Sequence, residues 1–226
     1  MGSARQGVSV ALSGDGNTAI VGGPGDNLWD RSVPFGLGAA GAAWVFTRSD
    51  GVWTQQGNKL VSTGAVGRLG TSVALSADGN IAIVGGVADD GGVALVFTRS
   101  GDHWAEGKKL VGTGAVGKSA PSVALSADGS IVMLGGSNDN GGVGAAWMFT
   151  RSGGYWTQGK NLVGTSAVGK SAPSVASADD SIVIVGRSND SGGIGEASAF
   201  TRSDGGSREP PRPPPSSNPA VNLGEE

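Results

Sequence analysis

The strongest constraint on this chain is an internal repeat that returns about every 51 residues. The tetrapeptide Phe-Thr-Arg-Ser occurs at 46–49, 97–100, 149–152 and 200–203, at steps of 51, 52 and 51 residues. A repeat of this length is typical of proteins in which one supersecondary unit packs against its own copies. We therefore expect four similar units within residues 1–206. Their approximate bounds are 5–51, 52–102, 103–154 and 155–206.

Each unit is predicted to contain four short β-strands, which are clearest in the second unit. The first is 72–76, where apolar and small or polar residues alternate, and Asp78-Gly79 then marks a tight hairpin. The second strand, 81–84, is apolar on both faces and should be central and buried. The third is 94–98, and the fourth surrounds Trp104 and carries lysines, as expected of a solvated edge strand.

No segment has the apolar period of an amphipathic helix, so the predicted fold class is all-β. Four antiparallel strands per 40–50 residues are the pattern of a β-propeller blade. A β-sandwich would use strands of similar spacing but gives no reason for four near-identical units. We therefore expect a propeller-like array of four four-stranded antiparallel blades, incomplete or open as a ring.

Three segments of the second unit resemble the FG-GAP repeat found in integrin α chains and in many bacterial surface proteins. They are Leu69–Ala74, Asp78-Gly79 and Ile83–Gly86, and Gly22-Gly23-Pro24 in the first unit resembles the Gly-Ala-Pro element. The resemblance covers about residues 5–205. It implies a propeller that acts as a binding or structural module outside the cell or at its surface. We find no segment of signal-peptide type in this chain.

The candidate contact residues lie in loops, because loops on a rigid scaffold commonly carry function. The first unit holds an insertion whose loop contains two aromatic residues. These residues are candidates for contacts with a partner, or they cover the edge of the blade. The Asn/Asp/Gly-Gly loops recur once per unit and should emerge on one common face, although tight loops also need such residues. The candidates are Trp29, Phe35, Asp89, Asp90, Asn138, Asp139, Asn189 and Asp190.

The composition leaves little room for catalysis. There is no cysteine and one histidine, His103, which occupies the outer-strand position filled by Val52 and Tyr155 in other units. Thiol, Ser-His-Asp and histidine-metal chemistry are therefore excluded within this chain. Asp15, Asp78 and Asp128 recur at equivalent turns, where a hairpin already explains them. We predict no catalytic residue, no metal ligand and no cofactor.

Calcium needs separate treatment, because the FG-GAP resemblance implies loops with several carboxylates. The matching loops here, 13–17 and 76–80, each contain one carboxylate, so the family's site is not carried over. The loops around Asp89-Asp90 and 138–140 are richer in oxygen but match no ligand spacing. We therefore predict no cofactor, with a bound calcium ion as the alternative.

The phase of the repeat predicts an open array. The first unit has no preceding tryptophan strand, and the fourth turns at 207–226 into a Pro-rich, disordered tail. An open array would have free blade edges, through which it could pair with further repeats or with another chain. The net charge of −3 argues against nucleic acid, and no apolar run reaches the length of a membrane span. We expect a non-catalytic module that binds an unknown protein or glycan. The alternatives are a carbohydrate-active hydrolase and a truncated fragment.

Overall fold

The computed structural model contains four antiparallel sheets, each with four strands. It describes residues 4–26, 39–88, 91–114, 121–136, 145–162, 174–177, 182–187, 196–203 and 206–208. In every sheet the strands are hydrogen-bonded in the order in which they occur along the chain. This arrangement confirms the predicted all-β class and the predicted four strands per repeat.

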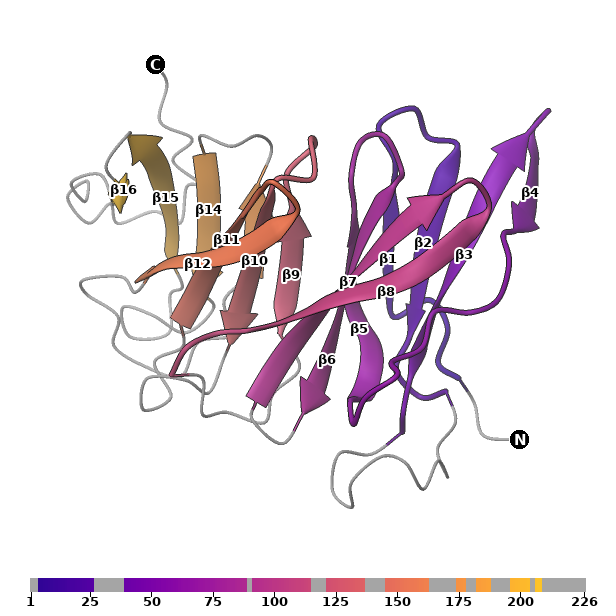
Figure 1. Ribbon diagram of the computed structural model, residues 1–226, viewed down its shortest axis with the longest axis horizontal. Helices are drawn as coiled ribbons and strands as arrows, with labels where there is room; N and C mark the ends of the chain where they lie inside the picture. The colour runs from indigo at the N-terminus through magenta and orange to yellow at the C-terminus, as the bar shows by residue number, and fades with distance from the viewer. Residues whose placement is uncertain are drawn as a thin grey trace.

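The strands differ in length from sheet to sheet, from 3 residues in β16 to 10 in β7. Figure 1 shows their arrangement. The first sheet contains β1 (Ser9–Leu12), β2 (Thr18–Gly23), β3 (Ala42–Ser49) and β4 (Val52–Gln55). The second contains β5 (Gly67–Leu75), β6 (Ile81–Ala88), β7 (Gly91–Ser100) and β8 (His103–Val111). The third contains β9 (Ser122–Leu125), β10 (Ile131–Gly136), β11 (Ala145–Ser152) and β12 (Tyr155–Leu162). The fourth contains β13 (Ser174–Ser177), β14 (Ile182–Arg187), β15 (Glu196–Ser203) and β16 (Gly206–Arg208).

The sheets differ in phase from the units predicted from the sequence. Each predicted boundary at 52, 103 and 155 falls between the third and fourth strand of one sheet, because the tryptophan strand pairs with the Phe-Thr-Arg-Ser strand before it. The fourth sheet also has a fourth strand, since β16 pairs with β15. Residues 207–208, which were predicted to begin the tail, therefore belong to this strand instead.

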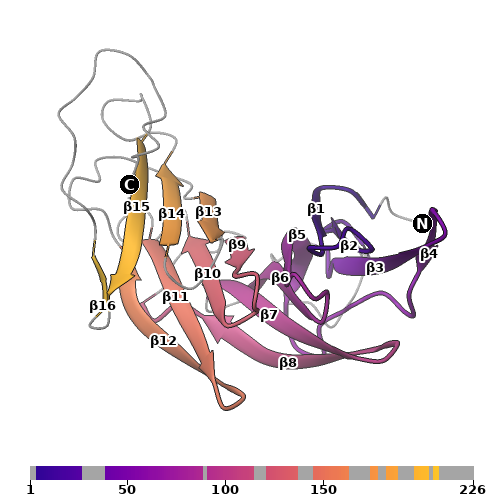
Figure 2. The ribbon, with the colours of Figure 1, turned by 90° about the horizontal axis from the view of Figure 1, so that it is seen from above.

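The four sheets follow one another along an arc (Figure 2). The first strands β1, β5, β9 and β13 lie along its concave side, and the fourth strands β4, β8, β12 and β16 lie along its convex side. The fourth strands β4 and β8 are the most exposed strands of their sheets, as the polar residues of these strands predict. Every residue of the second strand β6 is buried, as predicted.

The core forms between neighbouring sheets rather than within a single sheet. One cluster joins Ile20 and Val45 of the first sheet to Val73, Val84 and other residues of the second. A second cluster joins the second sheet to the third in the same manner. Because side chains alternate across a strand, each sheet has two apolar faces, one toward each neighbour.

We call the side of a sheet that faces its predecessor the front face and the other side the back face. The front face is built from the second and fourth residues of Ser-Val-Ala-Leu and from the residues paired with them across the sheet. In the second sheet this face comprises Val73, Leu75, Ala82, Val84, Leu95 and Phe97, all of which are buried. Val73 and Leu75 therefore share one face, as the sequence predicts.

Candidate functional site

The predicted contact loops begin at equivalent places in the four sheets. Each connects the second strand of a sheet to its third strand. Their candidate residues lie outside the described residues: Trp29, Phe35, Asp89, Asp90, Asn138, Asp139, Asn189 and Asp190. Their role in contacts stays a prediction.

The aspartates at the hairpins are held by their own turns. Asp15 Oδ1 accepts hydrogen bonds from Ser13 Oγ at 2.6 Å and from the Asn17 backbone N–H at 2.9 Å. Asp78 and Asp128 accept the same pair of bonds in their turns. The glycine after each aspartate has a φ near +70°, which favours glycine. The turn therefore explains why these residues recur.

These hydrogen bonds also lower the pKa of the turn carboxyls. The bond from Ser13, followed by those from Asn17, lowers the pKa of Asp15 from 3.8 to about 2. The pKa of Asp128 is lowered by Ser126 and Ser130. For Asp78, burial raises the pKa, but the hydrogen bonds from Ser76 and Asn80 outweigh it and the net shift is downward.

His103, the single histidine, lies at the outer edge of the array. His103 is exposed and begins β8, in the register position of Val52 and Tyr155. Tyr155 is also strongly exposed. Among the described residues, no group of three or more His, Asp or Glu side chains could hold a metal ion.

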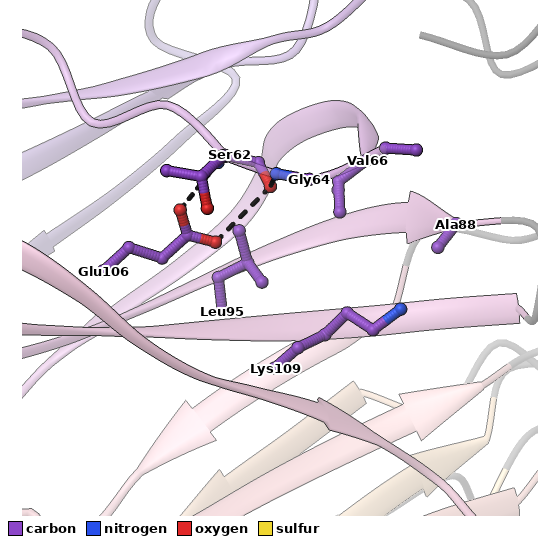
Figure 3. A pocket seen from close by; sticks show the side chains of 9 residues that line it. Ser62, Gly64, Val66, Ala88, Leu95, Glu106 and Lys109 are labelled. Carbon is purple, nitrogen blue, oxygen red and sulfur yellow. Dashed lines mark hydrogen bonds between the residues drawn. The ribbon is translucent and has the colours of Figure 1, made fainter. Parts of the chain in front are cut away.

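A pocket that sequence reasoning missed lies at the seam between the first two sheets (Figure 3). Its volume is about 430 Å³, which is within the usual range for small-molecule sites. One wall is the connection from β4 to β5, residues 62–66, and the other is the second sheet. The second sheet contributes Ala88, Leu95, Glu106 and Lys109.

Glu106 links the two walls of this seam pocket by hydrogen bonds. Its Oε2 accepts a 2.7 Å hydrogen bond from the Thr63 backbone N–H, and its Oε1 accepts a longer one, 3.4 Å, from Ser62 Oγ. Ser62 Oγ in turn accepts a bond from the Gly64 N–H. The carboxylate is thus fixed at the pocket wall, only partly buried, with hydroxyl groups beside it.

The equivalent seam between the second and third sheets is fastened in the same way but by a neutral group. Gln158 occupies the position of Glu106, and its Oε1 accepts hydrogen bonds from the backbone N–H and hydroxyl of Thr113. The matched pair shows that an amide can replace the carboxylate without loss of the backbone contact. Of these two described seams, only the first therefore carries a negative charge at this position.

The seam pocket exists because one apolar side chain is smaller in the second sheet. Leu95 pairs with Val84, in the position where Trp147 pairs with Leu134 in the third sheet. The buried Trp147 ring lies directly under Gly112, where a Cβ atom would be 2.2 Å from the ring. The first seam has Ser62 and Leu95 in place of Gly112 and Trp147, so the volume of the indole is left open.

The signal for this pocket was present in the sequence. The strand before Phe-Thr-Arg-Ser reads Ala-Ala-Trp in the first and third units but Val-Ala-Leu in the second. The consequence depends on which residue of the next connection lies over the ring, and packing between units decides that. Sequence reasoning that treats each unit alone cannot find it.

Comparison with known proteins supports the fold but not a family. No protein-family model and no curated protein matches the chain. The FG-GAP resemblance therefore stays a prediction.

Solved structures resemble the whole array. A putative 6-phosphogluconolactonase from Bacteroides uniformis matches 91% of this chain and 56% of its own, with 15% identity and a TM-score of 0.54. A Hadza microbial sialidase matches 89% of this chain and 43% of its own, with 15% identity and a TM-score of 0.53. A lectin from Aleuria aurantia matches 91% and 62%, with 14% identity and a TM-score of 0.51.

The four sheets form a β-propeller-like array. The solved proteins that the chain resembles in fold include β-propeller proteins. Each sheet is therefore a blade. The chain spans about half the length of the solved proteins that it matches. At these identities the likeness concerns the fold of the blades and not their activity. Within the described blades no helix has the length and apolar character needed to cross a membrane.

Proposed function

We propose that this chain is a non-catalytic propeller module that binds a glycan in the seam pocket between its first and second blades. The observation that carries the proposal is the pocket itself, which combines hydroxyl, carboxylate and ammonium groups with small apolar side chains. Sugars present many hydroxyl groups beside short apolar patches. A wall with both donors and acceptors, next to Val66 and Ala88, suits such a ligand.

Two further observations support a glycan over a protein partner. The pocket is small and concave, whereas protein partners commonly use larger and flatter surfaces. The Aleuria aurantia lectin, whose fold resembles this array, has been solved in complex with Fucα1-6GlcNAc. Asp89 and Asp90, the predicted contact pair, follow Ala88 of the pocket wall directly in the sequence. The proposal includes a location outside the cell or at its surface, as part of an exported protein.

The residues of the seam pocket support hydrolysis of a carbohydrate less well than they support its binding. Glycoside hydrolysis uses two carboxylates that flank the scissile bond. Glu106 is the only carboxylate among the described residues of the pocket, and both of its oxygens accept hydrogen bonds from the opposite wall. A group fixed in this manner is suited to positioning a ligand. Release of reducing sugar from a bound oligosaccharide by the wild-type chain would overturn the non-catalytic assignment.

The decisive variant fills the pocket with a residue pair that the chain already uses. Ser62→Gly combined with Leu95→Trp reproduces Gly112 and Trp147 of the next seam, so the double variant should fold. We expect wild-type protein to bind members of a glycan array that includes Fucα1-6GlcNAc, and the double variant to lose that binding. Equal binding by both proteins would exclude the seam pocket as the site.

The charge of Glu106 is tested separately. Glu106→Gln retains an acceptor for the Thr63 N–H, as Gln158 does for Thr113. Loss of a charge-assisted bond to a ligand hydroxyl should weaken binding by about tenfold in titration calorimetry. The reciprocal variant Gln158→Glu is the matched control and should leave glycan affinity unchanged.

A further inference from the structure

The front face of the first blade is an apolar surface whose first-strand residues no described residue covers, although the Ala4 carbonyl lies on the same side of Gly23 as the Trp44 ring. Val10 is 67% exposed and Leu12 is 60% exposed, although they are identical to the residues at these positions in the next two blades. The equivalent Val73, Leu75, Val123 and Leu125 are all buried. Val10 pairs with Val21, and Leu12 pairs with Ala19. These partners are also only partly buried, unlike the equivalent residues of the next two blades.

The same face extends across the whole first blade. Val21 pairs with Trp44, and Ala19 pairs with Phe46, so both aromatic side chains lie on the front face. They are partly exposed, whereas the corresponding Trp147 and Phe149 of the third blade are buried. The residue types at this face are those of a buried interface, and only their exposure differs.

The first two seams of the array show what packs on such a face. The front of the second blade lies against Ile20 and Val45 on the back of the first. The front of the third blade lies against Ile83 and Val96 on the back of the second. The surface that fits a front face is therefore a back face of the same repeat, with an Ile or Met on the second strand.

On the fourth blade the central residue of such a back face is exposed. Ile184 occupies the position of Ile20, Ile83 and Met133 and pairs with Ala176 and Ala199. Ile184 is 37% exposed, whereas Ile20, Ile83 and Met133 are fully buried. Figure 2 places the first and fourth blades at opposite ends of the arc. Both halves of one standard blade contact are therefore present at the two ends of this chain.

A backbone ladder between the blades continues this pattern. The Gly14 N–H donates to the Ala77 carbonyl at 2.9 Å, and the Ala77 N–H donates to the Ala127 carbonyl at 2.8 Å. The second and third blades therefore each receive one hydrogen bond from the blade before them. The Gly14 carbonyl is the equivalent acceptor on the first blade, and no described backbone N–H supplies it with such a bond.

We propose that two copies of this chain associate front to back, with the first blade of each copy on the fourth blade of the other. Two such contacts close a ring of eight blades, within the range of blade numbers seen in propellers. Leu12 and Val10 of one copy then cover Ile184 of the other. The contact is distinct from the seam pocket, so its failure would leave the glycan proposal untouched.

The proposal is tested by sedimentation equilibrium on the full chain over a series of protein concentrations. We expect a species of twice the 22.1 kDa mass of one chain. Leu12→Lys on the front face and Ile184→Lys on the back face should each weaken self-association by on the order of a hundredfold, because an unpaired ammonium would be buried among aliphatic side chains. Val52→Lys is the control, since Val52 is equally exposed but lies on the outer strand and on the opposite side of its sheet.

Mixing the two variants separates this geometry from others. The Leu12→Lys copy keeps a sound back face, and the Ile184→Lys copy keeps a sound front face, so the mixture should recover one contact and form a heterodimer. Recovery also shows that both variants are folded. A front-to-front dimer would be disrupted by Leu12→Lys alone and would not be restored by mixing.

Three results would overturn the proposal. The first is a wild-type chain that stays monomeric at every concentration, as expected if the segment 209–226 covers the front face. The second is an association that Val52→Lys weakens as much as Leu12→Lys does. The third is a dimer that Ile184→Lys leaves intact.

Discussion

In the first turn of each of the first three blades, the serine, the aspartate and the following asparagine or serine form a small electrostatic unit. The serine hydroxyl donates to the carboxylate and accepts from the first N–H of the second strand, at 2.9 Å in three blades. The aspartate must be ionised to accept all of its bonds. Each turn therefore links the start of a strand to the charge of one carboxyl group.

This linkage predicts a loss of stability in acid. The pKa of Asp15 is about 2 in the folded chain and 3.8 ordinarily, and the pKa values of Asp78 and Asp128 are lowered as well. Between these values the unfolded chain binds more protons than the folded one, so the free energy of unfolding falls as pH falls from about 4 to about 2. Urea denaturation at several pH values measures this slope.

The combined variant Asp15→Asn, Asp78→Asn and Asp128→Asn should flatten the dependence in that range. Asp50→Asn, which removes one exposed carboxylate outside these turns, is the control. A combined variant whose stability falls as steeply as that of the wild type would show that other groups cause the acid loss.

Individual residues were predictable from the sequence where their role is local. The turn aspartates are explained by partners two residues away, so the pattern alone identifies them. The effect of Leu95 was not predictable in this way, because its small size matters only beside Ser62 of another blade. The eight candidate loop residues lie outside the described residues, and their role stays a prediction.

The fourth strands act as fasteners between neighbouring blades. The first blade has one more residue than the others between its tryptophan and the following Leu-Val, and the strand register identifies this residue as Gln56. Its side chain is buried. Gln56 Oε1 accepts a 3.0 Å hydrogen bond from Trp104 Nε1, and its Nε2 donates to Asp102 Oδ1 at 3.0 Å.

Removal of this fastener should destabilise the array. Gln56→Ala leaves the Trp104 indole N–H without its acceptor, so we expect a loss of about 1–3 kcal/mol in the free energy of unfolding. Gln55→Ala is the matched control, because Gln55 is exposed and donates only to the nearby Gly57 carbonyl; its cost should stay within about 0.5 kcal/mol. Urea midpoints of the two variants measure the difference, and equal midpoints would contradict the role of Gln56.

The elements themselves followed from the sequence more fully than their grouping did. Alternation in Ser-Val-Ala-Leu and the apolar second strand predicted β5 and β6 correctly. The tryptophan strand was predicted as the fourth strand of a unit, and its pairing with the third strand agrees, but the unit bounds at 52, 103 and 155 were set one strand too early because a repeat can be cut at any point. The short strand β16 was missed because Gly-Ser-Arg has no apolar pattern to reveal it.

The stability of the whole array resides in the seams, since each blade contacts only its neighbours along the arc. This has a consequence that a single globular core would not have. Identical residues in equivalent blades contribute differently according to whether another blade lies on them. The open character of the array was predicted from the repeat phase, but which faces stay exposed follows only from the stacking.

The leucines of the three Ser-Val-Ala-Leu strands test this directly. Leu75→Ala and Leu125→Ala each open a cavity in a seam and should cost about 2–5 kcal/mol in the free energy of unfolding. Leu12→Ala removes an exposed side chain, so in dilute protein its cost should stay within about 0.5 kcal/mol. If a second copy covers Leu12, the cost of Leu12→Ala will grow with protein concentration, while those of the other two stay constant. Thermal melts at low and high concentration distinguish these cases, and a Leu12→Ala cost as large as that of Leu75→Ala in dilute solution would mean that the front face is already covered within one chain.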